Sequence, residues 1–266
     1  MTIFKWEFRK NLKSLFIWLV FIISIQFMYS ALFPSFAGEG GLFSSKMQLL
    51  PKVFLKIFGI EEIDFSNIIH FFAMQGQIWI FLFATFYVMR LASSIIVKEE
   101  DAKTVEFVLS RPLSRRQYIF EKILLVTVNT IIYDFIIALA LLYMFNAYKI
   151  KPFDMKQFWF IVFSYIAVHI FMALIGIISS TVVRKRATAD TITVFFLGFF
   201  YILSLIGRVY ENYAYLKKLT PFGIFDPADI IKSNSFNYKA FVFVILLYLA
   251  GAIFSVLYYE KKDIYT

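Results

Sequence analysis

The residues of this chain whose types and spacing could do chemistry form no recognisable catalytic or cofactor-binding motif. None of the ten glycines begins a phosphate-binding loop of the pattern G-x-x-x-x-G-K-[ST], and neither HExxH nor GxSxG is present. The chain has no cysteine, which excludes disulfides and thiolate metal sites, and its two histidines, His70 and His169, match no spaced metal-binding motif. We therefore expect no catalytic, cofactor-binding or metal site, and no enzyme activity in this chain by itself.

Charged side chains are concentrated in one polar stretch, KEEDAKTVEFVLSRPLSRRQYIFEK, from Lys98 to Lys122. It carries six Lys and Arg and five Asp and Glu in 25 residues, and the runs before and after it are nearly all apolar. By composition alone, this stretch is either a solvated loop without a partner or a surface at which the protein meets one.

Residue spacing within this stretch predicts a helix, a break and a second helix. A short helix is predicted by apolar residues at i, i+3 and i+4, which are Val105, Val108 and Leu109. Acidic residues fall in its first turns, and these are Glu99, Glu100 and Glu106. Pro112 prevents this helix from continuing, and Ser114 followed by Gln117 forms a capping box at which a second helix begins. Such a rigid connection can transmit motion from a soluble partner to the apolar runs on either side.

Three polar residues lie inside apolar runs further along the chain: Asn129, Asp134 and His169. An acid in the middle of a bilayer costs about 3 kcal/mol on insertion scales unless it is protonated or paired, so Asp134 is a candidate for substrate contact or a proton-linked role. The alternative, which we favour, is structural pairing with hydroxyls or amides such as Asn129 or those of a neighbouring span. We expect His169 to be a packing residue with its hydrogen bonds satisfied rather than a ligand.

The composition is that of an all-α membrane protein with a single transmembrane domain, residues 1–266. Of the 266 residues 61% are hydrophobic and 21% aromatic, and only 17% are charged, which excludes an ordinary soluble domain. The net charge of +9 comes from small basic groups at the ends of apolar runs. Anionic lipids and the positive-inside rule both favour basic residues there, so we expect no nucleic-acid partner.

Six apolar runs are long enough to cross a bilayer, which takes about 20 residues. We predict spans at about 15–36, 71–97, 123–145, 158–183, 191–207 and 241–258, with outer loops at 37–70 and 208–238 and the polar stretch 98–122 between spans two and three. In the second span, Arg90 is close enough to the end for its side chain to snorkel towards lipid headgroups. In the fourth span, Gly176 and Ser180 have the small-xxx-small spacing that lets another helix approach closely.

The first residues have the pattern of an amphipathic helix lying in the membrane interface. Apolar residues recur at helical spacing, namely Phe4, Phe8, Leu12 and Leu15. A basic stripe runs beside them, formed by Lys5, Arg9 and Lys13. The alternative is a plain charged flank of the first span. Residues 35–37 mimic a signal-peptidase site, but the apolar run before them exceeds the usual length of about 7–15 residues, so we expect no cleavage.

Basic residues also indicate the orientation of the chain. Six spans place both termini on one side, and with the termini inside, the inner segments carry Lys and Arg at about twice the density of the outer ones. We therefore expect both termini in the cytoplasm. In the last outer loop, Asp226, Pro227 and Asp229 provide an N-cap, a first-turn proline and a first-turn acid, which predicts the start of a short helix.

The order of residues in the polar stretch resembles the segment after the second span in type-two ATP-binding-cassette (ABC) permeases, particularly bacterial exporter subunits of about this length. The matching order, EE-x-x-x-T-x-E-x-x-L-S-x-P-x-S-R, is formed by Glu99, Glu100, Thr104, Glu106, Leu109, Ser110, Pro112, Ser114 and Arg115. The likeness extends to FKWEFRKNLKS, LFPSF, LTPFGIFDP and YYEKKDI, so it covers most of the chain. One departure is Lys103, where the family often has glycine before the threonine.

The resemblance implies a permease of a bacterial cell membrane that works as a homo- or heterodimer with two cytosolic ATPase subunits. ATP and magnesium would be bound by the ATPase and by no site in this chain. The stretch after the second span would be a coupling helix that docks on the ATPase, with the nine residues of the matching order as coupling candidates, and the N-terminal helix would be the family's connecting helix. Export follows from the resemblance and from the lack of an importer-like coupling sequence. A lateral, lipid-lined route would suit hydrophobic or antimicrobial peptides, drugs or lipids as cargo.

Two other classes of membrane protein remain as alternatives. A self-contained channel or secondary transporter would show inverted repeats and broken spans with polar pairs in matching halves, and no convincing internal repeat is present. A non-transporting membrane anchor or sensor subunit would tolerate replacement of residues 99–115.

Overall fold

The computed structural model describes residues 2–38, 56, 64, 66–109 and 114–263, and these form helices and connections without a strand. Five long helices are apolar enough to cross a membrane: α1 (Thr2–Gly38), α8 (Arg115–Tyr148), α9 (Met155–Val182), α10 (Arg186–Val209) and α14 (Tyr238–Lys261). A sixth crossing results if a bent pair is counted as one span. It consists of α4 (Ile68–Ile78), the π-helix η1 (Trp79–Ala84) and α5 (Thr85–Ile95), with a bend of 56°. The prediction of an all-helical membrane protein is thus confirmed, with five or six spans over the described residues.

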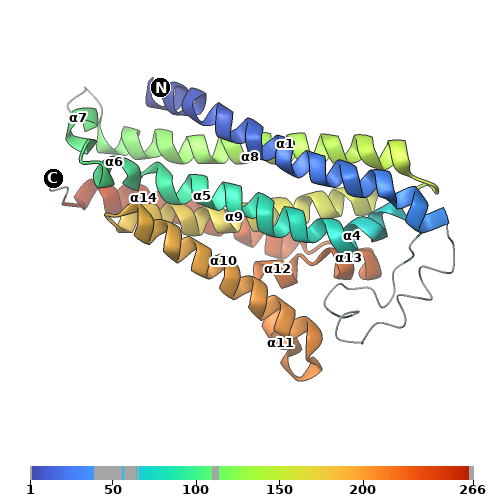
Figure 1. Cartoon of the computed structure of the whole chain (residues 1–266). Helices are drawn as coiled ribbons and strands as arrows, with labels where there is room; N and C mark the ends of the chain where they lie inside the picture. The colour runs from blue at the N-terminus through green and yellow to red at the C-terminus, as the bar shows by residue number, and fades with distance from the viewer. Residues whose placement is uncertain (1, 39–55, 57–63, 65, 110–113, 264–266) are drawn as a thin grey trace.

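The long helices run alongside one another, and α9 forms the centre of the bundle (Figure 1). In α9, 67% of the most apolar window is buried, against 22% in α10 and 17% in α14. Both ends of the chain lie at the end of the bundle that also carries the short helices α6 (Val97–Asp101) and α7 (Val105–Leu109) (Figure 1). The polar stretch is therefore placed beside the N-terminal and C-terminal segments.

Close packing of α9 on α5 depends on the small residues predicted to allow it. A Cβ atom added to Gly176 would lie 2.6 Å from the Cβ of Ala92 and 3.0 Å from the backbone nitrogen of Ser93. One turn later, the Ser180 hydroxyl accepts hydrogen bonds from the backbone N–H groups of Ile96 and Val97, both at 3.0 Å. These two N–H groups lie where α5 ends and α6 begins, so Ser180 holds the start of the polar stretch against the central helix.

The N-terminal residues are continuous with the first span rather than a separate helix. At 1.5 Å per residue, the 37 residues of α1 extend about 55 Å, whereas the hydrocarbon core of a bilayer is about 30 Å thick. One end of α1 must therefore project beyond the core. The predicted apolar stripe is displaced: Leu12 is 44% exposed, and the buried face consists of Ile3, Glu7, Leu15 and Leu19.

The loop predicted to be the second outer one, 208–238, is largely ordered into short helices, in the order η2 (Glu211–Tyr213), α11 (Ala214–Lys217), α12 (Pro221–Ile224) and α13 (Pro227–Ser233). The predicted cap at Asp226 is confirmed, because its side chain accepts from the N–H of Ala228 at the start of α13. The Asp226 carboxylate is fully buried and also pairs with Arg208 at 2.7 Å and Lys217 at 2.8 Å. The LTPFGIFDP sequence is thus held by ion pairs against the C-terminal end of α10. Most of the other predicted outer loop, 37–70, lies outside the described residues.

Candidate functional site

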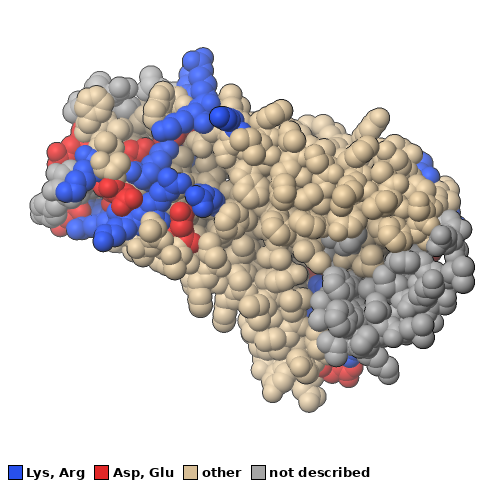
Figure 2. All heavy atoms as spheres, in the orientation of Figure 1, with Lys and Arg blue, Asp and Glu red and all other residues tan. Residues whose placement is uncertain are grey.

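Charged side chains gather at the end of the bundle that holds the polar stretch. Figure 2 shows basic and acidic atoms intermixed there, while the face along the spans is almost free of charge. The stretch consists of α6, a turn, α7 and the start of α8, so it is continuous with the second and third spans. Both flanking spans extend directly from this candidate coupling site.

A left-handed residue separates α6 from α7, where the sequence pattern predicts one helix. Lys103 has φ 55°, the conformation that favours glycine. Its N–H bonds the carbonyl of Glu100 at 3.0 Å, and the N–H of Thr104 bonds the carbonyl of Glu99 at 2.9 Å, which together form a Schellman motif. The chain therefore makes, with lysine, the turn for which glycine was expected, and Glu99 and Glu100 belong to α6 rather than to the first turns of α7.

Buried ion pairs attach α6 to α1 and α8. Lys98 donates to Glu7 at 2.6 Å, and the ammonium nitrogen of Lys122 lies 3.6 Å from the other Glu7 oxygen. Lys122 also donates to Glu99 at 2.5 Å, and Tyr118 donates its hydroxyl to the same carboxylate at 3.2 Å. The side chains of Glu7 and Lys122 are each 1% exposed. Removing one partner of such a buried pair leaves an uncompensated charge and costs about 3–5 kcal/mol.

A further pair attaches α6 to the C-terminal segment. Lys262, immediately after α14, donates to Glu100 at 2.8 Å and to the carbonyls of Thr181 and Val183 at 2.7 and 3.0 Å. Burial lowers the pKa of Lys262 below its usual value, and the hydrogen bond and charge of Glu100 act in the opposite direction. We call the three carboxylates and three ammonium groups of these pairs the ionic cluster: Glu7, Lys98, Glu99, Glu100, Lys122 and Lys262.

The restart of the helix after the predicted proline break is confirmed at Ser114. Its hydroxyl accepts from the N–H of Gln117 at 3.1 Å and caps α8. Arg115 donates to the carbonyls of Glu260 and Lys262 at 3.3 and 3.0 Å, and Arg116 forms an ion pair with Glu260. The beginning of α8 is therefore fastened to the end of α14.

The outward side of the stretch is formed by α7 and the turn before it. Thr104 and Glu106 are exposed, and Phe107 is 72% exposed. A groove of about 530 Å³ lies between this side and the first turns of α1, lined by Ile3, Trp6, Lys10, Thr104, Phe107 and Val108 among others. An exposed aromatic ring beside a groove is a surface that a protein partner can bury.

The predicted coupling residues thus occupy different positions in the structure. Glu99 and Glu100 point inward and bind lysines of other helices and segments, the exposed Arg115 binds backbone carbonyls at the end of α14, and Ser114 is a helix cap. Thr104 and Glu106 are on the outward side. Leu109 ends α7, while Ser110 and Pro112 lie outside the described residues.

Sequence reasoning missed the role of Glu7, Lys98, Lys122 and Lys262. A signal for Glu7 was present, because it is the one acid among the first 14 residues and it follows Ile3 by four, on the face that continues to Leu15 and Leu19. Its partners were not visible, because they lie 91 and 115 residues away in the chain.

A second polar site lies inside the bundle and joins Asp134 of α8 to His169 of α9. The His169 Nδ1 atom is 2.6 Å from the carboxylate of Asp134, and its Nε2 atom is 3.3 Å from the carbonyl oxygen of Ile80 in the π-helix η1. Tyr165 also donates to the backbone carbonyl of Asp134 at 3.2 Å. Asp134 and His169 are 2% and 0% exposed, so water does not compete for the pair.

This arrangement corrects the partner predicted for Asp134, which is an imidazole rather than a hydroxyl or an amide. His169 is a buried packing residue with both ring nitrogens within hydrogen-bond distance of an oxygen atom, as expected. Asn129 instead accepts from the hydroxyl of Tyr87 at 2.6 Å. Within the described part of the chain, no group of three or more His, Cys, Asp or Glu side chains could hold a metal ion.

Comparison with models of protein families gives a match that covers nearly the whole chain. A family model described as ABC-2 family transporter protein matches residues 1–263. No curated protein matches the chain significantly. The match includes the polar stretch, the N-terminal residues and all the helices described above.

Proposed function

Because the chain belongs to the ABC-2 family of transporter proteins and is therefore a membrane-spanning permease, we propose that it is the transmembrane subunit of an ABC exporter that couples transport to ATP hydrolysis by a separate subunit. In this proposal two permease chains, identical or different, combine with two cytosolic ATPase subunits that bind ATP and magnesium. Both termini and the polar stretch face the cytoplasm of a bacterial cell.

The observation that carries this proposal is the division of the polar stretch into an outward and an inward side. The outward side, with Thr104, Glu106 and Phe107, offers exposed polar groups and an aromatic ring to the ATPase. The inward side is bound by the ionic cluster to α1, α8 and the residue after α14. A displacement of α7 by the ATPase would therefore be passed to three membrane spans as well as to α5.

Rigid attachment is the property that coupling requires, because a loosely held loop would absorb the movement of the ATPase. The ionic cluster provides buried, charge-balanced pairs, and the Ser180 hydroxyl adds two hydrogen bonds at the junction of α5 and α6. We assign docking to the outward side and transmission to the inward side.

Substitutions on the two sides separate docking from transmission. We expect Glu106→Lys and Phe107→Ala each to reduce recovery of the ATPase with the tagged permease about tenfold, because a truncated central aromatic contact costs at least about 1–2 kcal/mol. Glu100→Gln with Lys262→Met removes the inward pair together, so we expect ATPase binding to persist while substrate-stimulated ATP hydrolysis falls. Measurement requires co-purification and ATPase assays on the same detergent-solubilised complex.

A matched control is Phe120→Ala, since Phe120 is 57% exposed near the start of α8 but does not line the groove. It should leave ATPase recovery unchanged. Full retention of the ATPase in both outward variants would exclude this docking surface, and a non-transporting anchor subunit would show that result.

The cargo and the oligomer form a second part of the proposal. The lateral faces of α10 and α14 are largely exposed and apolar, which suits contact with lipid, a second permease or a hydrophobic cargo. We propose hydrophobic or antimicrobial peptides, drugs or lipids as exported substrates. Stimulation of ATP hydrolysis by amphipathic peptides in reconstituted vesicles tests the cargo, and the mass of the solubilised complex tests for two permease chains.

A further inference from the structure

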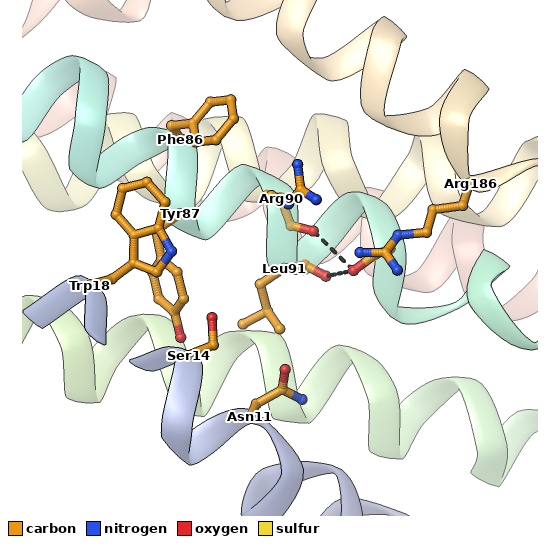
Figure 3. Close-up of a pocket in the computed structure, with 9 residues that line it drawn as sticks. Asn11, Ser14, Trp18, Phe86, Tyr87, Arg90, Leu91 and Arg186 are labelled. Carbon is orange, nitrogen blue, oxygen red and sulfur yellow. Dashed lines mark hydrogen bonds between the residues drawn. The ribbon is translucent and has the colours of Figure 1, made fainter. Parts of the chain in front are cut away.

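A second pocket lies between α1, α5 and the start of α10, and it shares Arg186 with the groove beside the docking surface. Its volume is about 270 Å³, against about 30 Å³ per water molecule in liquid water. Asn11, Ser14 and Trp18 come from α1, and Arg186 is the first residue of α10. The remaining residues are from α5 and include Phe86 and Arg90 (Figure 3).

Two arginines give this pocket a positive charge that nothing in its wall balances. Arg90 is exposed and forms no ion pair with any described residue. Arg186 extends from α10 towards α5 (Figure 3), and its acidic contact is Asp190, at 3.8 Å on its own helix. None of the described residues that line the pocket is acidic. Asp190 is itself engaged, because it accepts from Ser93 at 2.5 Å.

The start of α10 adds to this positive potential. Lys185 at its N-cap makes no side-chain cap hydrogen bond, so the first N–H groups of this 24-residue helix receive none from that position. The N-terminus of a helix attracts anions through these groups and the helix dipole. Two guanidinium groups and a helix N-terminus therefore favour an anion, and guanidinium groups bind phosphate oxygens in a bidentate manner.

The pocket also has a polar end at the membrane boundary and an aromatic end deeper in the membrane, which matches the headgroup and the acyl chains of a lipid. Arg186 begins its span and thus lies at the membrane boundary, and Arg90 is within two turns of the end of α5. Phe86 lies one turn deeper than Arg90, and its ring centroid is 5.9 Å from that of Trp18. Trp18 is also 5.9 Å from Tyr87. This aromatic wall is placed for acyl chains, and the arginines are placed for a headgroup.

We propose that this pocket binds the phosphodiester headgroup of an anionic phospholipid from the leaflet on the side of the ionic cluster. The phosphate contacts Arg90 and Arg186, the hydroxyl of Ser14 and the amide of Asn11 offer further donors to the headgroup, and the first part of an acyl chain lies on Trp18 and Phe86. The argument for this site does not depend on the proposed coupling to an ATPase, although Arg186 also lines the groove beside the docking surface.

Native mass spectrometry of the purified full chain tests this site. The delipidated protein is incubated with equimolar phosphatidylglycerol and phosphatidylcholine, and bound lipids are identified by mass. We expect phosphatidylglycerol to be retained about tenfold more than phosphatidylcholine, because both lipids carry the phosphodiester but only phosphatidylcholine adds a choline cation, which the two arginines repel. Arg90→Gln and Arg186→Gln should each lower this preference several-fold, and together they should remove it.

Arg9→Gln is the matched control, since Arg9 is an exposed arginine of α1 that does not line the pocket. It should leave the preference unchanged. Equal retention of the two lipids by the unaltered protein, or the same preference in the double variant, would overturn the proposal. In a separate experiment, inorganic phosphate is added to the protein with bound phosphatidylglycerol. Displacement of the lipid by phosphate at similar concentrations would also overturn the proposal and would indicate a site for soluble phosphate.

A second measurement does not depend on variants. Raising the salt concentration should weaken phosphatidylglycerol binding to the unaltered protein and leave phosphatidylcholine binding constant, because exposed charges are screened. Salt-independent binding would refute the role of the arginines. All these readouts use the permease chain alone, so their failure would leave the proposed ATPase docking untouched.

Discussion

Removing the buried pair between Asp134 and His169 should destabilise the bundle more than removing any neutral hydrogen bond in it. Both ring nitrogens of His169 face oxygen atoms, the Asp134 carboxylate at 2.6 Å and the carbonyl of Ile80 at 3.3 Å. For both contacts to be hydrogen bonds, one proton must lie between the two side chains, on either of them. The pair is electrically neutral in both forms, which is why the interior of the bundle accommodates it.

The magnitude follows from what each single substitution leaves behind. His169→Ala leaves Asp134 fully buried, and its other carboxylate oxygen has no hydrogen-bond partner in the described part of the chain. Asp134→Ala leaves an imidazole with one acceptor. We expect each change to cost about 3–5 kcal/mol, and the double variant to cost much less than the sum, with a coupling energy of about 3 kcal/mol.

The control is the neutral pair of Tyr87 and Asn129, joined at 2.6 Å in the same bundle. The substitutions Tyr87→Phe and Asn129→Ala should give a coupling energy of about 1 kcal/mol, as for other hydrogen bonds between membrane helices. Both double-mutant cycles are measured as free energies of reversible unfolding of the purified chain in mixed micelles. A coupling energy for Asp134 and His169 equal to or below that of the control would refute the reasoning.

Asp134→Asn tests whether the pair has a role in transport in addition to its role in stability. Asparagine keeps the shape and one acceptor but removes the exchangeable proton of the carboxyl group. If the pair is structural, transport and expression should remain normal. Loss of transport at normal expression and stability would instead indicate a proton-linked or substrate-binding role.

Three further substitutions test local features of the fold by the same unfolding measurement. Lys103→Gly should stabilise the protein by about 1 kcal/mol, because Lys103 has φ 55° and glycine adopts this conformation without strain. The control Lys103→Ala should not stabilise the protein. Destabilisation by glycine would contradict the Schellman turn. Gly176→Ala should cost about 1–3 kcal/mol, since its Cβ would meet α5 at 2.6 Å, while the control Gly198→Ala has open space and should be neutral or stabilising. Asp226→Ala should cost about 3 kcal/mol through loss of a cap and of two buried ion pairs, and Asp229→Ala, whose side chain is 60% exposed, should cost less than about 1 kcal/mol. Equal costs for the two aspartates would refute the buried network.

Features that depend on neighbouring residues could be predicted from the sequence. The caps at Ser114 and Asp226 were predicted because an N-cap and the N–H group it accepts from are two or three residues apart. The close approach at Gly176 and Ser180 was predicted because small residues one turn apart share a helix face. The unusual Lys103 was recognised as a departure from the family pattern, and its φ angle now shows why glycine is common there.

Features that depend on distant residues could not be predicted in the same way. Glu99 and Glu100 have the composition of a solvated helix face, and only the arrival of Lys122 and Lys262 turns them inward. The pairing of Asp134 with His169 could have been predicted from the sequence. The number of residues from Asp134 to the end of α8 equals the number from the start of α9 to His169. Two helices joined by a short connection run antiparallel, so equal distances from the turn predict a pair.

The pair of Glu100 and Lys262 has a consequence for the order in which the protein is made. The two residues are separated by 162 positions, so Glu100 is synthesised well before its partner. Until α14 has been inserted, α6 lacks one of its attachments and the beginning of α8 lacks the carbonyls that Arg115 binds. The surface that we propose to receive the ATPase is therefore completed last, and a permease whose final span has not yet entered the membrane presents an unfinished site to its partner.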